Sequence, residues 1–163
     1  MSKKANVLKL IIAIIIPLAV GVLSSFITKD AMISFNAMKK PPLAPPGILF
    51  PIVWSILYVL MGISSCIIYE FNVKIDTVKS RIKNDCLVLY VIQLVFNFFW
   101  SSLFFRFKLY YFALAWLVVL WILVFALILK CMKINKIASY LLIPYILWMT
   151  FAAYLNISIT LLY

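Results

Sequence analysis

Two amides, an indole and a hydroxyl share one face of a long apolar segment, at Gln93, Asn97, Trp100 and Ser101. Their spacing of 4, 3 and 1 residues, continued three residues later by Phe104, is typical of one side of a helix. Side-chain amides within an apolar helix either hydrogen bond to neighbouring helices or line a binding site. We expect Gln93 and Asn97 to do one or both.

Three other apolar segments carry faces that combine aromatic with small or polar residues. These faces are Trp54, Tyr58, Met61, Gly62 and Ser65; Tyr145, Trp148, Ala152 and Asn156; and Pro17, Gly21, Ser24, Ser25 and Thr28. Small residues let a neighbouring backbone or a flat ligand approach closely, so ordinary helix packing is the alternative for each face taken alone. Taken together, the faces predict an aromatic pocket with a few amides and hydroxyls, which suits a bulky apolar ligand.

Conventional catalysis is not expected. The chain has no histidine, which removes His-based zinc sites, Ser-His-Asp triads and His-ligated haem. No charged residue lies inside the apolar segments, so a serine or cysteine there has no base to activate it. Ion-coupled transport also usually needs an intramembrane charge. We predict no metal site and no cofactor.

The elements that must hold these residues follow from composition. Of the 163 residues, 67% are hydrophobic and 12% are charged, and the mean hydropathy is +1.18. A soluble domain has about 45–50% apolar and about 25% charged residues. The long, continuous apolar runs predict an all-α integral membrane protein, a single five-helix bundle over residues 1–163. We expect the spans at residues 8–28, 48–69, 86–105, 110–129 and 137–161.

The net charge of +11 is read as a membrane orientation signal. Lysines and arginines flank the spans, ten on the side of the N-terminus and five on the other side. The positive-inside rule therefore predicts a multi-pass protein of the cell membrane with a cytoplasmic N-terminus and an outside C-terminus. The same cations would meet anionic lipid headgroups, so the bilayer is the expected partner and nucleic acid is not.

The connection between the first two predicted spans, residues 29–47, is rich in proline. Proline fixes φ and removes an N–H donor, so this loop should be stiff and non-helical. It is the best candidate for a lid over a pocket. The lid residues we expect are Lys39, Lys40, Pro41, Pro45 and Pro46.

Three motifs that follow one another along the chain resemble the TspO/MBR family, which comprises tryptophan-rich sensory proteins and the translocator protein, or peripheral benzodiazepine receptor. The first motif is KPPLAPPG at residues 40–47 followed by FPIVWSILYVLMG at residues 50–62. The others are QLVFNFFWS at residues 93–101, and PYILW at 144–148 with FAAYLN at 151–156. Together they are specific and extend over nearly the whole chain.

The resemblance implies a five-helix homodimer of bacterial origin with a pocket beneath the first loop. Family ligands are porphyrins such as protoporphyrin IX, sterols and synthetic isoquinoline carboxamides, and some bacterial members are linked to light-dependent porphyrin breakdown. Two departures matter here. Ser34-Phe35 stands where the family often has Trp-Tyr, and no Lys or Arg follows Tyr154, so sterol binding is not carried over.

We therefore predict a membrane receptor that binds tetrapyrroles or other bulky apolar ligands. The expected ligand-binding residues are Trp54, Tyr58, Gln93, Asn97, Trp100, Tyr145, Trp148 and Ala152. Two alternatives stay open. One is light-dependent porphyrin degradation through Trp54 and Trp148, with no other catalytic residue, and the other is facilitated transport of a small amphipathic solute.

Overall fold

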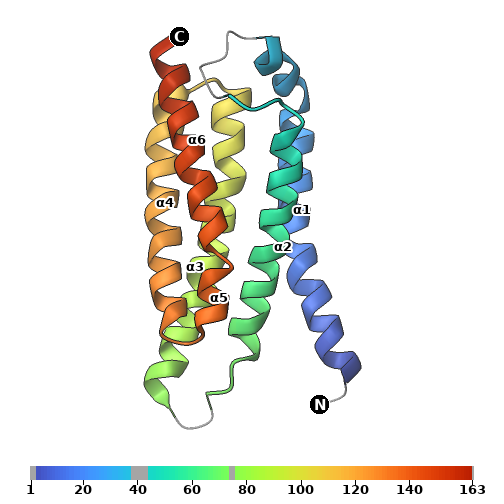
Figure 1. Ribbon diagram of the computed structural model, residues 1–163, viewed down its shortest axis with the longest axis vertical. Coiled ribbons are helices and arrows are strands. Elements are labelled where there is room, and N and C mark those ends of the chain that lie inside the picture. Colours follow the sequence, from blue (N-terminus) through green and yellow to red (C-terminus); the bar gives the residue numbers. More distant parts are fainter. Residues whose placement is uncertain (1–2, 38–43, 74–75, 163) are drawn as a thin grey trace.

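The structure, a computed structural model, describes residues 3–37, 44–73 and 76–162, and within the first range the side chains of residues 6–29 only. No strand occurs in this part of the chain. The elements are α1 (Lys3–Ala37), α2 (Leu49–Glu70), α3 (Thr77–Ser101), the π-helical turn η1 (Ser102–Arg106), α4 (Tyr110–Met132), α5 (Lys136–Tyr140) and α6 (Ile143–Leu162). They form one elongated bundle, with the start of α1 and the end of α6 at opposite ends (Figure 1).

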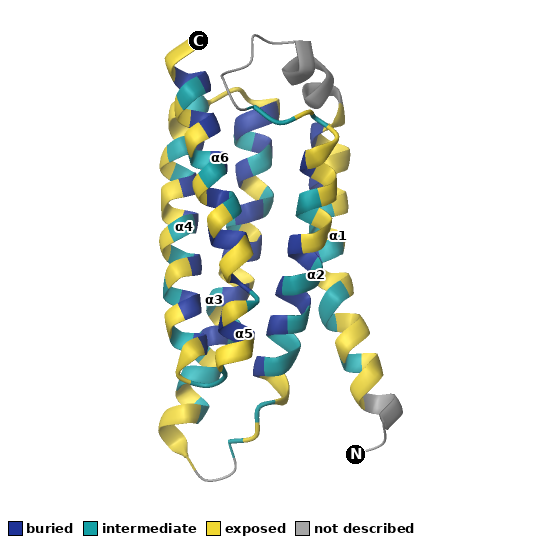
Figure 2. Ribbon diagram, in the orientation of Figure 1, coloured by how far each residue is buried: buried dark blue, intermediate teal, exposed yellow. Residues whose placement is uncertain are grey.

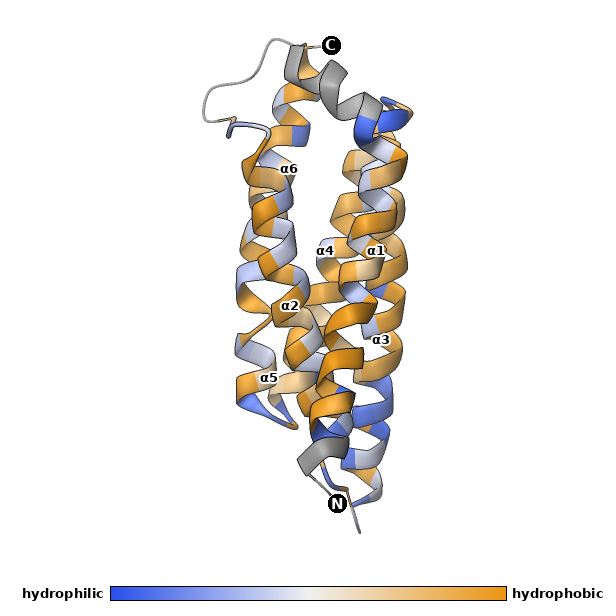
Figure 3. Ribbon diagram, turned by 90° about the vertical axis from the view of Figure 1, so that its right-hand side faces the viewer, coloured by the Kyte–Doolittle hydropathy of each residue, from blue (hydrophilic) through white to orange (hydrophobic). Residues whose placement is uncertain are grey.

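Five of these stretches are long and apolar enough to cross a membrane, which confirms the predicted all-α fold class. They are Asn6–Lys29, Leu49–Glu70, Thr77–Arg106, Tyr110–Met132 and Lys136–Leu162. Much of the outer surface is apolar, and buried residues face the bundle interior (Figure 2). Hydrophilic residues gather towards the ends of the helices (Figure 3). This distribution suits a bundle whose outer surface is solvated by lipid chains.

The helices pack as a closed ring. Helix α1 lies against α2 and also contacts α3 and η1, α3 packs on α4, and α4 packs on α6. The short α5 contacts α2 as well as α4 and α6. The ring places the faces predicted on α2, α3 and α6 towards one shared interior, where Met61, Val124 and Met149 are fully buried.

Helix α1 is longer than predicted. It continues to Ala37, so the expected non-helical loop over residues 29–47 is wrong for its first nine residues. Residues 29–37 contain neither proline nor glycine, and nothing in the local backbone therefore stops the helix before the proline-rich motif. The turn into α2 begins after Pro45 and Pro46.

Two other boundaries also differ from the prediction. Helix α3 begins at Thr77 and not at Cys86, because Asp76 caps it by accepting a hydrogen bond from the Lys79 amide (3.0 Å). That hydrogen bond lowers the pKa of the Asp76 carboxyl. The predicted fifth span is divided into α5 and α6, because Pro144 has no N–H to continue the ladder from Tyr140.

Candidate functional site

A cavity of about 460 Å³ lies between α1, the N-terminal half of α2 and the junction of α3 with η1. We call it the aromatic cavity. Its volume falls in the range of small-molecule sites, about 300–1,000 Å³. Gly47 lies at its edge, next to the described end of the proline-rich loop. The side chain of Val22 on α1 is 53% exposed, which leaves one side of the cavity open between the helices.

The lining of the aromatic cavity includes five hydroxyl groups from three helices. The contributing residues are Ser24, Ser25 and Thr28 from α1, Ser55 from α2 and Ser101 from α3. Two of these hydroxyls donate to the carbonyl four residues earlier, Thr28 to Ser24 at 2.9 Å and Ser55 to Pro51 at 2.7 Å. Such bonds satisfy the donor within the helix and leave the oxygen lone pairs free to accept from a ligand. Lys29 adds the cavity's positive charge.

The aromatic rings of the lining, which we call the aromatic wall, centre on Trp54. Its ring stacks on Tyr58, with centroids 5.5 Å apart and an interplanar angle of 29°. It also meets the edge of Tyr145 at 6.0 Å and lies tilted against Trp100 at 6.4 Å. Phe50 and Phe105 are the other aromatic residues of the lining, whereas Trp100 and Tyr145 lie behind it. Offset and edge-on contacts of this kind hold rings in fixed orientations, so the wall presents a rigid apolar surface.

A chain of hydrogen bonds fixes Tyr58 from behind. Tyr58 Oη donates to Asn97 Oδ1 (2.8 Å), and Asn97 Nδ2 donates to Tyr145 Oη (2.9 Å). Tyr145 Oη in turn donates to Gln93 Oε1 (3.0 Å), and Gln93 Nε2 points to the sulfur of Met61 (3.6 Å). All five side chains are buried. The chain therefore joins α2, α3 and α6 and positions the cavity wall.

Gly21 lets Tyr58 reach the wall of the cavity. A Cβ atom at this position would lie 2.3 Å from Cε2 of Tyr58 and 2.8 Å from its Cδ2. No real Cβ makes contacts that short, so a side chain here would displace the ring. Glycine is needed at this place because the ring packs directly on the α1 backbone.

The structure separates the predicted ligand-binding residues into three groups. Trp54 and Tyr58 line the aromatic cavity. Gln93, Asn97 and Tyr145 lie behind Tyr58, with their polar groups already paired. A direct role of the last three in ligand binding stays a prediction.

The remaining predicted residues lie in or against the core. Trp100 is 3% exposed and stacks on Phe104, and Ala152 is buried on α6. Trp148 meets the edge of Phe50 at 6.0 Å. The indole N–H groups of Trp100 and Trp148 are buried and make no hydrogen bond. Of the predicted lid, Lys39, Lys40 and Pro41 lie outside the described residues, and Pro45 and Pro46 directly precede the turn at Gly47.

Several lining residues were not predicted as ligand-binding. Phe105 reaches the cavity because the chain winds into a π-helical turn at Ser102–Arg106, and no sequence pattern marks such a turn. The α1 face of Gly21, Ser24, Ser25 and Thr28 was visible as a polar stripe, but it fitted helix packing equally well. Among the described residues, no group of three or more Cys, Asp or Glu side chains is placed to hold a metal ion.

Comparison with known proteins gives several matches in sequence. The model of the TspO/MBR family matches residues 13–162. The chain is 39% identical over 160 residues to the tryptophan-rich protein TspO of Archaeoglobus fulgidus, which covers 96% of this chain and 98% of that protein. It is 37% identical over 155 residues to the TspO protein of Chlorobaculum tepidum, covering 94% of this chain and 95% of that protein.

A more distant relative comes from an animal. The translocator protein of Ovis aries is 29% identical over 125 residues, which covers 75% of this chain and 70% of that protein. On the family match and on these identities, the chain belongs to the TspO/MBR family.

Proposed function

We propose that this multi-pass membrane protein is a receptor that binds a tetrapyrrole of the protoporphyrin type in the aromatic cavity. The observation that carries the proposal is a cavity lining that combines the stacked rings of Trp54 and Tyr58 with hydroxyl groups and one lysine, Lys29. A flat macrocycle would stack on the aromatic wall. Its acidic side groups would accept hydrogen bonds from the ammonium group of Lys29, which lines the cavity. Membership in a family named for tryptophan-rich and translocator proteins supports a membrane sensory or binding role.

The test is a titration of the purified protein in lipid nanodiscs with protoporphyrin IX, followed by the Soret absorbance of the porphyrin. This readout does not depend on which tryptophans remain. We expect saturable one-to-one binding, weakened in Trp54→Phe. Trp121→Phe is the matched control, because this indole lies on α4 outside the cavity and donates to Thr150 (3.0 Å). Equal affinities in both variants would contradict the site.

A second candidate function, porphyrin photo-oxidation, has its own support. A series of neighbouring aromatic rings leads from Trp148 to Trp54. The distances between successive ring centroids are 6.0 Å for Trp148–Phe50, 6.4 Å for Phe50–Phe105, 6.2 Å for Phe105–Trp100 and 6.4 Å for Trp100–Trp54. Light-excited porphyrin would take one electron from an indole, leaving a tryptophan radical cation and a porphyrin radical anion. Dioxygen would take that electron from the porphyrin anion to give superoxide, and the tryptophan radical cation would oxidise the porphyrin and so recover its own electron. Superoxide would combine with the resulting porphyrin radical cation, and the adduct would open the macrocycle with both oxygen atoms retained, which abolishes the Soret band. Aerobic loss of the Soret band under light, slowed in Trp54→Phe and absent in the dark, would support this reaction.

We also propose that the N-terminal end of the bundle faces the cytoplasm. This end carries Lys9, Lys83, Lys130 and further lysines and an arginine, whereas Lys29, Arg106 and Lys108 are the described cations near the other end. The positive-inside rule supports that orientation. Single cysteines at Lys133 and Lys108, labelled in intact cells with a membrane-impermeant maleimide on a cysteine-free background, test it. Labelling only at position 108 is expected, and labelling only at position 133 would reverse the assignment.

A further inference from the structure

A second hollow of about 610 Å³ lies between the N-terminal half of α1, the C-terminal half of α2 and α3. We call it the apolar groove. Its lining is almost wholly aliphatic or aromatic, and the side chains at its open side are half exposed on the outer surface of the bundle. These are Ile12 (49%), Ile16 (50%), Val91 (59%) and Val95 (48%). In a membrane this opening faces the lipid chains.

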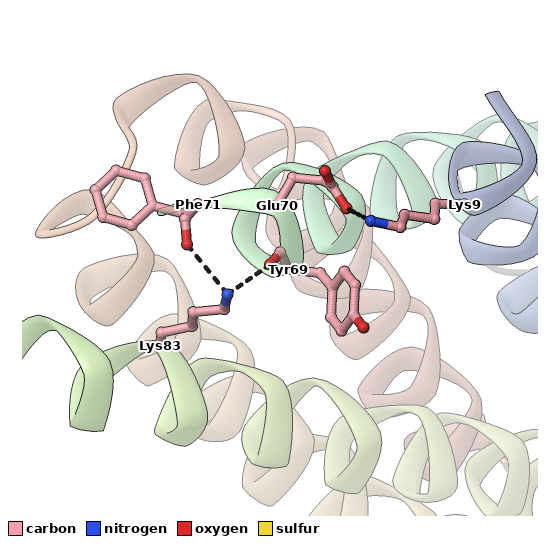
Figure 4. Close-up of polar contacts among 5 residues, drawn as sticks. All are labelled: Lys9, Tyr69, Glu70, Phe71 and Lys83. Carbon is pink, nitrogen blue, oxygen red and sulfur yellow. Dashed lines mark hydrogen bonds and ion pairs between the residues drawn. The ribbon is translucent and has the colours of Figure 1, made fainter. Parts of the chain in front are cut away.

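Three charged side chains, Lys9, Glu70 and Lys83, gather around Tyr69 at the C-terminal end of α2 (Figure 4). Lys9 and Tyr69 line the groove at this end. Lys9 Nζ lies 2.7 Å from Glu70 Oε1 and 5.8 Å from the centre of the Tyr69 ring. Lys83 Nζ lies 5.5 Å from the same ring, so two ammonium groups approach Tyr69 from two different helices. The hollow therefore combines an apolar body with one cationic end.

The cationic end has unused binding capacity. Lys83 donates only to backbone carbonyls, those of Tyr69 (2.5 Å) and Phe71 (3.1 Å), and forms no ion pair with any described residue. An ammonium group has three donors, so one remains. The Lys9–Glu70 pair is about one-third exposed, and pairs of that kind are weak and easily exchanged. With Lys9, Lys83 and Glu70 together, the cluster carries one net positive charge.

We propose that the apolar groove binds one anionic membrane phospholipid. An acyl chain would lie along α1 and α3 beside Ile16, Val91 and Val95, and the phosphate would sit at Lys9 and Lys83. Charge complementarity favours this occupant, because a lipid supplies an apolar chain and a negative group at one end. A second copy of the chain docking through the same faces would leave the Lys83 charge without a counter-ion.

The test compares two lipids by native mass spectrometry. The protein is released from nanodiscs that contain phosphatidylglycerol and phosphatidylcholine with matched acyl chains. We expect one retained phosphatidylglycerol per chain, bound in preference to phosphatidylcholine. A cation near a membrane surface contributes about 1 kcal/mol to anionic-lipid binding, which corresponds to about a fivefold change in affinity.

Two variants of the ion pair separate lipid binding from helix packing. We expect Lys9→Gln to weaken the preference for phosphatidylglycerol about fivefold, and Glu70→Gln to strengthen it by a similar factor. Both changes break the same α1–α2 ion pair, so a purely structural role would move the two variants in one direction. Lys133→Gln, at the same end of the bundle but outside the groove, is the matched control and should leave the preference unchanged.

A third variant fills the groove without touching the core. Val91 is 59% exposed, and Val91→Trp should remove the retained lipid while the thermal unfolding midpoint and porphyrin titration stay near wild type. Equal retention of the two lipids by the wild type would overturn the proposal, as would parallel effects of Lys9→Gln and Glu70→Gln. Disulfide-linked dimers of Val95→Cys that retain no lipid would do the same, assigning the groove to a second copy.

Discussion

The aromatic cavity and the apolar groove are built from the same pair of helices, α1 and α2, and yet they differ in chemistry. The cavity combines hydroxyl groups with rings whose mutual angles are set by packing. The groove has almost no polar lining and carries its charges at one end. The first arrangement suits a rigid ligand with polar edges, and the second suits a flexible chain with a charged end.

The two hollows also differ in what lies behind them. Behind the cavity, the bonds from Tyr58 through Asn97 and Tyr145 to Gln93 fix the aromatic wall in one position. The open side of the groove instead consists of half-exposed aliphatic side chains such as Ile16 and Val91, which have no polar group to orient a ligand. Preorganised polar support usually accompanies specificity, so we expect the cavity to be the selective site.

The largest expected effect comes from the close contact of α1 with α2 at Gly62, because both hollows lie between these two helices. A Cβ at Gly62 would lie 2.6 Å from the Ala13 carbonyl oxygen and 2.6 Å from the Ile14 Cα, both backbone atoms that cannot rotate away. Gly62→Ala should therefore separate α1 from α2, at a cost of about 1–3 kcal/mol, and impair porphyrin and lipid binding together. The measurement is the thermal unfolding midpoint in detergent, followed by both titrations.

A second substitution tests whether the new Cβ at position 62 clashes with the backbone of α1 or with the Ala13 side chain. Ala13→Gly added to Gly62→Ala should not restore the midpoint, because the clash is with the backbone and not with the Ala13 methyl group. An unchanged midpoint in Gly62→Ala, or full rescue by Ala13→Gly, would show that the helices do not meet as closely as described.

Gly21→Ala is expected to affect the cavity alone. Its new Cβ would meet the Tyr58 ring edge, and the ring can swing away only by giving up its bond to Asn97. Overpacking of about 1–2 kcal/mol predicts a porphyrin affinity about tenfold weaker. The preference of the groove for phosphatidylglycerol serves as the internal control in the same variant. Parallel loss at both sites would mean that the two hollows are coupled through α1.

The broad architecture was predictable from sequence because continuous apolar runs have one solution in a bilayer, a bundle of spanning helices. Helix ends were less predictable, since α1 and α3 extend past the apolar runs into polar segments. There, caps and prolines decide the boundary. Asp76 caps the start of α3, and Pro144 interrupts the helix between α5 and α6. The hydropathy of the sequence detects neither effect.

The site was predictable in part. Periodicity placed Trp54 and Tyr58 on one helical face, and the structure puts both at the cavity. It also placed Gln93 and Asn97 together on α3, but spacing along one helix does not reveal which neighbour satisfies an amide. That partner is Tyr145, 48 residues after Asn97, and only the tertiary fold brings the two side chains within 2.9 Å. Because such pairs are far apart in the chain, the sequence did not distinguish the residues that line the cavity from those that hold the lining in place.

The smallest expected effect tests the support behind the wall. Tyr58→Phe keeps the ring and its stacking on Trp54 but removes the hydrogen bond to Asn97 Oδ1, leaving a buried amide oxygen without its donor. Interhelical hydrogen bonds in membranes contribute about 0.6 kcal/mol on average, so porphyrin affinity should fall about threefold and lipid preference should not change. Adding Asn97→Leu removes the stranded oxygen but also leaves Tyr145 without the Asn97 donor. The double variant should therefore bind no better than Tyr58→Phe, and recovery to wild-type affinity would show that the ring alone, without the chain behind it, defines the cavity wall.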